Sequence, residues 1–223
     1  MNENTKPYVV LSAAMTIDGK IASRGGDPEL SDEEDWIEVH KLRKECDAIM
    51  VGKNTIFTDD PKLRIKYHEH QGCYRIIVDS NLSIPISSKV ISYKPETYPT
   101  IICTTENISK KKLEKFREKN VEIIQAGKGE RVDLIQLMPL LYQKGIKSLL
   151  LEGGGTLNWS FFNNGLVDEL RITIAPWIIG GKDAISLVEG KGFYKMKQGV
   201  KFRLIDVKSR DNYVSLRYKR REK

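Results

Sequence analysis

The chain has 223 residues, a length that suits one large α/β domain or two small ones and allows a sizeable buried core. Hydrophobic residues make up 40% and charged residues 30%, which excludes a wholly disordered chain. Lysine and arginine outnumber the acids 37 to 30, for a net charge of +7. Because these charges are scattered, we expect mainly a solvated Lys/Glu-rich surface, with some attraction for a phosphorylated ligand.

No apolar run approaches the roughly 18–20 residues that a membrane-spanning helix needs. The opening MNENTKPYVV contains an acid and no long apolar stretch, so we expect no secretory signal and a cytoplasmic location. The three cysteines form no CxxC pair. His68 and His70 form an HxH in a polar stretch, which favours a solvated loop over a metal site, and we expect no metal.

Apolar runs alternate with helical patterns almost to the end of the chain. In chain order we expect a strand over 8–16, a helix to about 44, strands over 47–52, 74–79 and 100–104, a helix over 110–119, a strand over 121–125, a helix with its stripe over 134–141, a strand over 146–152, a helix to about 164, a strand over 169–174, and a hairpin of 202–208 with 213–219.

Local signals refine three of these elements. Ser31, with Glu34 three residues later, predicts a capping box at the start of the first helix. A polar turn is expected after Gly52. Pro139 lies inside a helical stripe and should kink or shorten that helix, and Gly145 should end it.

Strands that alternate with helices and finish in a hairpin predict an α/β fold. We expect three layers around a mostly parallel central sheet with an antiparallel C-terminal hairpin. The sequence has no internal repeat and no low-complexity linker, so residues 1–223 are interpreted as a single domain.

The strongest single feature is an apolar strand that runs into Glu152-Gly153-Gly154-Gly155-Thr156. Glycines let the backbone approach a ligand closely, and the free amides of a helix start favour a phosphate. The alternative is an ordinary strand-to-helix turn, for which one glycine suffices. Neither GxGxxG nor GxxxxGK[ST] is present. Glu152 lies either at a ligand crevice or at a helix start that its charge stabilises.

Other polar residues are open to two interpretations each. Thr55 and Asp59 follow a second strand end, where they could bind a cofactor or form a turn. Arg43 lies on an apolar helix face beside His40, which suits a phosphate or carboxylate ligand, or an internal ion pair. Lys66 is a second phosphate ligand or a solvated loop lysine.

Taken together and in order, several segments resemble the stand-alone riboflavin-biosynthesis reductases that act on 2,5-diamino-6-(ribosylamino)-4(3H)-pyrimidinone 5′-phosphate. These enzymes are related to the reductase domain of the bifunctional bacterial deaminase-reductases and have a fold similar to dihydrofolate reductase. The segments that carry the resemblance are MTIDGKIA at 15–22, Val51-Gly52 with Thr55 and Asp59-Asp60-Pro61, RIIVDS at 75–80, LEGGGTL at 151–157, GLVDE at 165–169, and Ala175-Pro176 with Gly180-Gly181.

The resemblance implies roles for individual residues. Those expected to bind the dinucleotide are Met15, Thr55, Asp59, Ser80, Gly153, Gly154, Gly155, Thr156 and Leu157, with the run from Gly154 to about Ser160 holding the diphosphate. Those expected to bind the substrate are Asp27, Arg43, Leu63, Lys66 and Glu152, with Arg43 and Lys66 at its phosphate or ribose.

The implied reaction is hydride transfer from NADPH, with NADH as an alternative, to C1′ of the ring-opened imine of the ribosylamine. The product is the ribitylamino compound. Ring opening needs a proton, and Glu152, Asp18, Asp59 or a bound water are left open as its source. Lys110 to Lys112 are candidates for the 2′-phosphate of the cofactor. The zinc-deaminase signature HxE…PCxxC has no match in this sequence.

Relatives are homodimers, and the strand at 169–174 or the run Trp177-Ile178-Ile179 could supply an apolar contact, with core packing as the alternative. A dihydrofolate or pteridine reductase on the same fold is disfavoured by Arg43 and Lys66, because a pterin has no ribose phosphate. A nucleic-acid-binding module is disfavoured by scattered charge and only 8% aromatic residues.

Overall fold

The computed structural model describes residues 5–221. The chain divides into two compact units, which are described separately. Unit 1 contains Met1–Tyr8 and His40–Leu150, and unit 2 contains Val9–Val39 and Leu151–Lys223. The boundary falls within helix α1 (Glu33–Glu45). The interpretation of the chain as one reductase domain stays a prediction.

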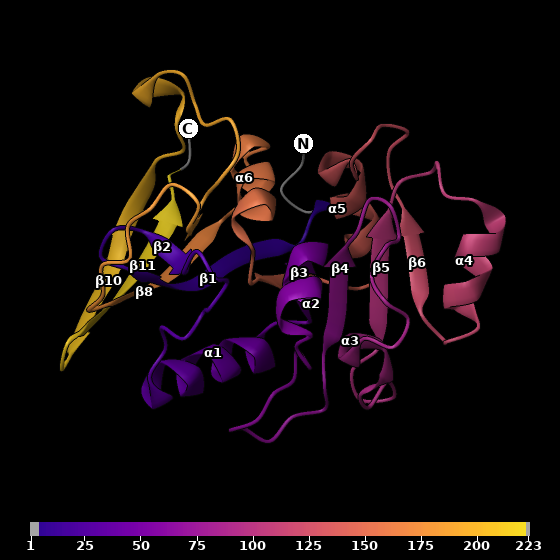
Figure 1. Cartoon of the computed structure of the whole chain (residues 1–223), viewed down its shortest axis with the longest axis horizontal. Coiled ribbons are helices and arrows are strands. Elements are labelled where there is room, and N and C mark those ends of the chain that lie inside the picture. Colours follow the sequence, from indigo (N-terminus) through magenta and orange to yellow (C-terminus); the bar gives the residue numbers. More distant parts are fainter. Residues whose placement is uncertain (1–4, 222–223) are drawn as a thin grey trace. The chain divides into compact units, whose positions relative to one another are not determined.

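Unit 1 consists of strands and helices that alternate along the chain (Figure 1). Its elements are β3 (Ala48–Gly52), α2 (Lys53–Asp59), β4 (Tyr74–Val78), α3 (Lys89–Ser92), β5 (Thr100–Thr104), α4 (Lys110–Arg117), β6 (Glu122–Gln125), α5 (Leu134–Gln143) and β7 (Ser148–Leu151). The strands lie in the order β7-β3-β4-β5-β6, and the pairs β3–β4, β4–β5 and β5–β6 are parallel.

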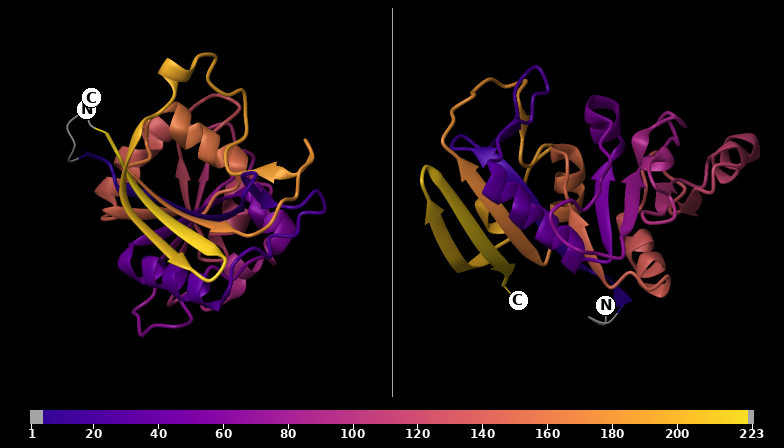
Figure 2. Two further views of the ribbon diagram at one scale, coloured as in Figure 1. Left: turned by 90° about the vertical axis from the view of Figure 1, so that its left-hand side faces the viewer. Right: turned by 90° about the horizontal axis from the view of Figure 1, so that it is seen from below.

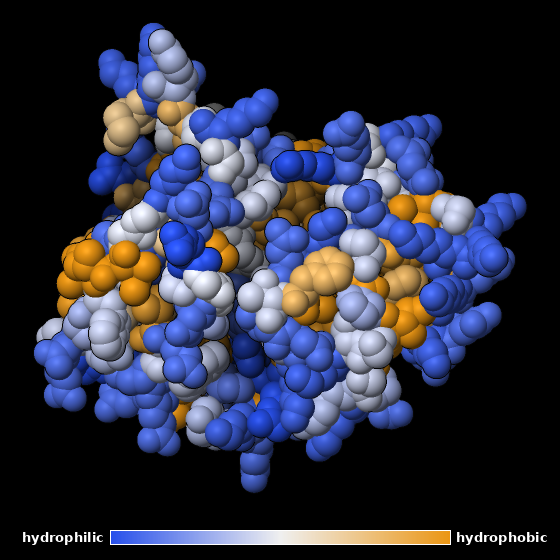
Figure 3. Space-filling model, in the orientation of Figure 1, coloured by the Kyte–Doolittle hydropathy of each residue, from blue (hydrophilic) through white to orange (hydrophobic). Residues whose placement is uncertain are grey.

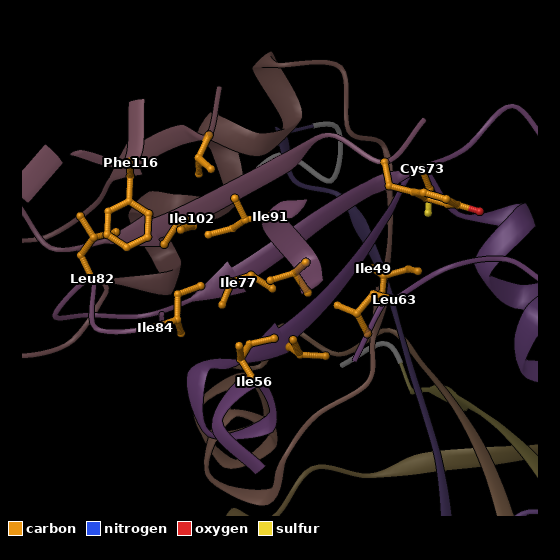
Figure 4. Packing of buried hydrophobic residues seen from close by; sticks show 14 of the residues in the cluster. Ile49, Ile56, Leu63, Cys73, Ile77, Leu82, Ile84, Ile91, Ile102 and Phe116 are labelled. Carbon is orange, nitrogen blue, oxygen red and sulfur yellow. The ribbon is translucent and has the colours of Figure 1, made fainter. Parts of the chain in front are cut away.

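The core of unit 1 forms where alternate strand residues meet the helices. Ile49, Ile77 and Ile102 come from β3, β4 and β5, and Ile56 and Phe116 pack on them from α2 and α4 (Figure 4). The residues between them on the strands are buried too, which explains why these parallel strands are continuous apolar runs rather than alternating patterns.

Unit 2 combines one parallel strand pair with a long antiparallel hairpin. Its elements, besides the first part of α1, are β1 (Tyr8–Thr16), β2 (Lys20–Ala22), α6 (Gly155–Asn163), β8 (Glu169–Ala175), β9 (Ile185–Ser186), a 3-10 turn η2 (Met196–Gln198), β10 (Phe202–Arg210) and β11 (Tyr213–Arg220). The strand order is β10-β11-β8-β1, and β2 pairs separately with β9. Only β1–β8 is parallel in the larger group, and the yellow β10–β11 hairpin is twisted (Figure 2).

The predicted fold class is confirmed: the sheet is mostly parallel and ends in an antiparallel C-terminal hairpin. The polar turn expected after Gly52 is wrong, because helix α2 begins there with Ile56 buried and Asp60 ending it in a left-handed conformation. The expectation that Ser31 caps the first helix is wrong, since Asp32 is the capping residue: its Oδ1 accepts a hydrogen bond from Asp35 N at 2.8 Å.

Two further predictions about helices have different outcomes. Helix α5 contains Pro139 and continues to Gln143, so the expected shortening is wrong, and the alternative of a kink stays a prediction. Asp133 caps this helix by accepting hydrogen bonds from the amides of Ile135 and Gln136. Gly145 follows it with a positive φ of 99°, as the predicted stop requires.

Candidate active site

The glycine run at the start of α6 is held in one shape by its packing. Gly153 has a φ of +90°, and the peptide bond between Gly153 and Gly154 is cis. A Cβ atom added to Gly155 would lie 2.5 Å from the carbonyl oxygen of Ser186, so only glycine fits there without movement of the backbone. At Gly154, in contrast, an added Cβ meets nothing within 4 Å.

The segment after β9 fastens this loop to the rest of unit 2. Glu189 N donates to Gly155 O at 3.1 Å, and Thr156 Oγ1 donates to Glu189 Oε2 at 3.0 Å. Asn158 Nδ2 donates to Leu187 O at 2.8 Å. The loop conformation is therefore set by partners 29 or more positions away in the chain.

These features fit the diphosphate of a dinucleotide. Gly154 is the N-cap of α6, and no side chain caps the helix there, so the positive end of the helix dipole can face an anion. The open space beside Gly154 allows the backbone to approach a ligand closely. Asn158 is 1% exposed, and among residues 5–221 its Oδ1 has no hydrogen-bond partner. This acceptor suits a donor group elsewhere on a ligand, since diphosphate oxygens only accept.

Asp18 lies in a tight turn after β1. Thr16 Oγ1 donates to Asp18 Oδ1 at 2.6 Å, and the amides of Ile179 and Gly180 donate to the same carboxylate at 3.3 and 2.7 Å. The bond from Thr16 and the two amide bonds lower the pKa of Asp18 to about 2. Asp18 is therefore ionised at neutral pH, which argues against its predicted role as a proton donor and points to a structural one.

The remaining site candidates of unit 2 lie at element ends. Glu152 is half-buried and directly follows the last residue of β7. Met15 is half-buried on β1, opposite Ile174 of β8. Asp27 is exposed and accepts a hydrogen bond from Glu29 N at 3.0 Å, which is turn chemistry.

In unit 1, the predicted substrate residues gather on one helix and one loop. Arg43 is 8% exposed, and its Nη1 donates a hydrogen bond to Arg64 O at 2.7 Å. The partner of this nitrogen is therefore a backbone carbonyl and not the carboxylate of an internal ion pair. Lys66 is exposed on the same loop, two residues further on. Leu63 is 4% exposed and belongs to the core cluster (Figure 4), so a contact with substrate through its side chain is not supported.

The predicted cofactor residues of unit 1 lie on α2 and after β4. Thr55 is half-buried within α2, and Asp59 is its last residue. Asp59 is exposed overall, yet desolvation of its carboxyl raises its pKa. Ser80 Oγ accepts a hydrogen bond from Val132 N at 3.1 Å, which leaves the hydroxyl proton for a further acceptor.

Three side chains that the sequence did not single out as site residues surround the loop of Lys66: His40, Arg75 and Tyr98. His40 shares the helix face that made Arg43 a candidate, which was the one signal available. His70 accepts a hydrogen bond from Gly72 N at 2.9 Å and contacts Tyr98 Oη at 3.0 Å, so it is part of this network rather than a solvated loop residue.

Residues 5–221 contain neither a metal-binding cluster nor a membrane-spanning helix. No group of three or more histidine, cysteine, aspartate or glutamate side chains in that range could hold a metal ion. Within the same range, no helix is both long enough and apolar enough to cross a membrane.

Solved structures share this architecture, which is a dihydrofolate-reductase-like fold. RibD of Acinetobacter baumannii superposes with a TM-score of 0.81 over 97% of this chain and 58% of that chain, at 24% identity. Rib7 of Saccharomyces cerevisiae, described as a riboflavin biosynthesis reductase, gives a TM-score of 0.74 over 99% of this chain and 93% of that chain, at 20% identity. At these identities the likeness shows the fold alone.

The sequence comparisons identify the family. The model of the RibD C-terminal domain matches residues 7–216, and this chain belongs to that family. The 2,5-diamino-6-ribosylamino-4(3H)-pyrimidinone 5′-phosphate reductase of Methanothermobacter thermautotrophicus is 45% identical over 89% of this chain and 91% of its own length. The protein of the same name from Aquifex aeolicus is 40% identical over 89% of this chain and 90% of its own length. The family resemblance expected from the motifs is confirmed.

Proposed function

We propose that this protein reduces the ribosylamino group of 2,5-diamino-6-(ribosylamino)-4(3H)-pyrimidinone 5′-phosphate to the ribitylamino group, a step of riboflavin biosynthesis. The observation that carries the proposal is the 45% identity to a reductase of that name across almost the full length of both chains. Residues 7–216 match the family model, so both units take part in the similarity.

The glycine loop of unit 2 supports a dinucleotide cofactor. The uncapped start of α6 and the open space at Gly154 suit a diphosphate, and Thr156 and Leu157 occupy the first turn of the same helix. When bound, a nicotinamide cofactor supplies the hydride. NADPH is the expected form, with NADH as the alternative, and the amino groups of Lys110 to Lys112 at the start of α4 are the candidate ligands of a 2′-phosphate.

Arg43 and Lys66 are proposed to bind the 5′-phosphate of the substrate. The bond from Arg43 to Arg64 O orients the guanidinium, which offers a planar set of donors for phosphate oxygens. Lys66 adds a point charge from the loop that carries Arg64. A pterin has no such phosphate, and the relatives are named as pyrimidinone phosphate reductases, so a dihydrofolate-type activity is not favoured.

Glu152 is proposed to orient the ribose rather than to serve as the obligate acid of ring opening. It follows β7 directly and is half-buried, a position from which a carboxylate can accept hydrogen bonds from ribose hydroxyls. If so, Glu152→Gln retains most of kcat, since an amide oxygen still accepts these bonds. A collapse of kcat with unchanged substrate binding would contradict the assignment.

The experiment that tests the reaction is the loss of absorbance at 340 nm with the ribosylaminopyrimidine phosphate. NADPH and NADH are compared as cofactors, and dihydrofolate replaces the substrate in a parallel assay. Oxidation that requires the ribosylamine supports the proposal, whereas turnover of dihydrofolate alone overturns it. Lys66→Ala should raise KM for the phosphorylated substrate about tenfold or more and leave KM for its dephosphorylated form nearly unchanged.

A cytoplasmic location and a homodimer remain part of the proposal. The run Trp177-Ile178-Ile179 is 56%, 65% and 42% exposed, which is consistent with an apolar contact. Strand β8, the other candidate, is paired on both edges within unit 2 and is better explained as core. An apolar patch is visible in the left-hand part of the surface view (Figure 3). Strand β10 also exposes Leu204 and Val207. Sedimentation equilibrium measures the oligomeric state directly.

A further inference from the structure

The loop that carries Lys66 has no helix or strand of its own. It lies between α2, which ends at Asp59, and β4, which begins at Tyr74. Backbone groups in such a segment have no ladder or helical partner and must be satisfied by other groups. The position of Lys66 therefore depends on whatever side chains bind the backbone of this loop.

Side chains from outside the loop bind its backbone at four of the five residues 62–66. Their hydrogen bonds are Arg75 Nη1 to Lys62 O at 3.2 Å, Arg43 Nη1 to Arg64 O at 2.7 Å, Ile65 N to Tyr98 Oη at 3.2 Å, and Lys66 N to His40 Nδ1 at 3.0 Å. Each of these four side chains lies in a helix or strand or is itself buried. This part of the loop is thus held at four residues by helix, strand and buried side chains of unit 1.

His40 is connected to Lys66 by two sets of contacts. Its Nδ1 accepts the hydrogen bond from the backbone amide of Lys66, and its ring packs edge-on against Tyr67 with centroids 5.1 Å apart. Tyr67 in turn contacts the ammonium group of Lys66, which lies 3.2 Å from the phenol oxygen and 4.7 Å from the ring centroid. The imidazole of His40 therefore contacts the backbone of Lys66 directly and its side chain through Tyr67.

The imidazole is suited to this task because it stays neutral. His40 is 6% exposed, and burial, followed by the positive charges of Arg43, Arg64 and Lys66, lowers its pKa to about 4. A neutral ring can accept a hydrogen bond at Nδ1, which a protonated ring cannot do. The contact therefore persists at physiological pH, beside the cations that would bind a phosphate.

We propose that His40 is a positioning residue that places Lys66 for the 5′-phosphate of the substrate. The inference rests on the proposed function for the identity of the substrate, but its geometry rests on the contacts of His40 alone. It predicts that loss of the acceptor at His40 affects the affinity for the phosphate rather than the chemical step. His40 touches neither the reacting atoms nor, in this proposal, the phosphate itself.

The test compares two variants of the full-length protein. Asparagine places Oδ1 where Nδ1 of histidine lies, so His40→Asn keeps the acceptor, and His40→Leu removes it at similar volume. We expect His40→Leu to raise KM for the phosphorylated substrate about tenfold, with kcat and KM for the dephosphorylated substrate nearly unchanged. His40→Asn keeps the acceptor but loses the ring contact with Tyr67, so it should restore most of the wild-type affinity.

His70→Leu is the matched control. His70 also accepts a hydrogen bond from a loop amide, that of Gly72 at 2.9 Å, but it does not contact Lys66. If His70→Leu raises KM for the phosphorylated substrate as much as His40→Leu does, the effect is a general loosening of the loop and the proposal is overturned. The proposal is also overturned if His40→Leu lowers kcat for both substrates equally.

A second measurement does not depend on turnover. Hydrogen exchange of the Lys66 amide should be slow in the wild type and in His40→Asn, and about tenfold or more faster in His40→Leu. Binding of inorganic phosphate, followed by the chemical shift of the same amide, should weaken chiefly in His40→Leu. If the wild type fails to reduce the pyrimidine but both results hold, the proposed function fails and the positioning role stands. Unchanged exchange and phosphate binding overturn the positioning role.

Discussion

Thr173 Oγ1 donates a hydrogen bond to Asp35 Oδ1 at 2.5 Å, which ties strand β8 to the first turn of α1 within unit 2. Both residues are buried, at 7% and 4% exposure. Asp35 also accepts a bond from Ser31 Oγ and lies 3.7 Å from Nη2 of Arg210. A buried carboxylate with these partners depends on each of them.

Replacing Thr173 with valine should destabilise the protein. Thr173→Val keeps the shape of the side chain but removes one donor from the buried Asp35, at a cost of about 1–3 kcal/mol in the free energy of unfolding. Thr173→Ser keeps the hydroxyl and should lose less. Urea unfolding of the two variants measures the difference, and equal midpoints would show that the bond contributes no net stability.

Substitution by alanine should affect the stability of the fold at Gly155 but not at the neighbouring Gly154. Gly155→Ala puts a Cβ 2.5 Å from Ser186 O and should destabilise the fold by about 1–3 kcal/mol, the usual range for overpacking. Gly154→Ala points a Cβ into open space and should leave the melting temperature nearly unchanged. It should weaken cofactor binding, because the methyl group occupies the proposed approach to the diphosphate. Calorimetry measures both stability and binding, and equal melting temperatures would contradict the packing argument.

Asp18→Asn should leave the pH profile of kcat unchanged. The hydrogen bond from Thr16 and the amides of Ile179 and Gly180 keep the pKa of Asp18 near 2, so this carboxyl does not titrate in the working range of the enzyme. A new or missing limb in the profile of the variant would restore Asp18 as a proton donor.

The same shift has a consequence for acid stability. Because the pKa of Asp18 in the folded state is lower than its ordinary value of 3.8, the stability that it contributes is present above that value. It is lost as the pH falls toward 2. The variant should therefore lose less stability than the wild type over that window, as measured by urea unfolding at each pH.

His40 should make the protein less stable in mild acid. Its pKa is about 4 in the folded state against an ordinary 6.5, so below pH 6.5 the unfolded chain binds the proton more readily. Stability should fall between pH 6.5 and 4 by on the order of 2–3 kcal/mol from this group. His40→Asn should remove that part of the slope. A wild type and variant with parallel stability curves across this window would show that His40 titrates normally.

Most of the fold could be predicted because its strands are long apolar runs with clear ends. The predicted strands over 8–16 and 100–104 match the structure, since β5 is buried throughout and β1 over residues 9–12, and such apolar runs leave little other interpretation. Helix α2 was missed because its sequence KNTIFTD is rich in turn formers, and only the burial of Ile56 and the left-handed Asp60 make it a helix. Strands β2 and β9 are three and two residues long, too short for periodicity to detect.

Some residues of the candidate site could likewise be predicted from the sequence, and others could not. The glycine run could be recognised because three consecutive glycines after a strand are rare in an ordinary turn. The roles of His40 and Asp18 could not, since they depend on hydrogen bonds to Lys66 and to Gly180, whose positions the sequence does not give. A polar side chain can be a ligand or a turn anchor, and only its partners decide between the two.

The division of the chain into two units bears on the order in which the protein forms during its synthesis. Nearly all of unit 1 is the continuous stretch His40–Leu150, which leaves the ribosome before the second half of unit 2 has been made. Strand β1 pairs with β8, whose residues lie more than 150 positions later, so this pairing must wait until β8 has been made. A nascent chain stalled just after residue 150 would expose the unpaired edge of β1, an opening for a chaperone or for aggregation.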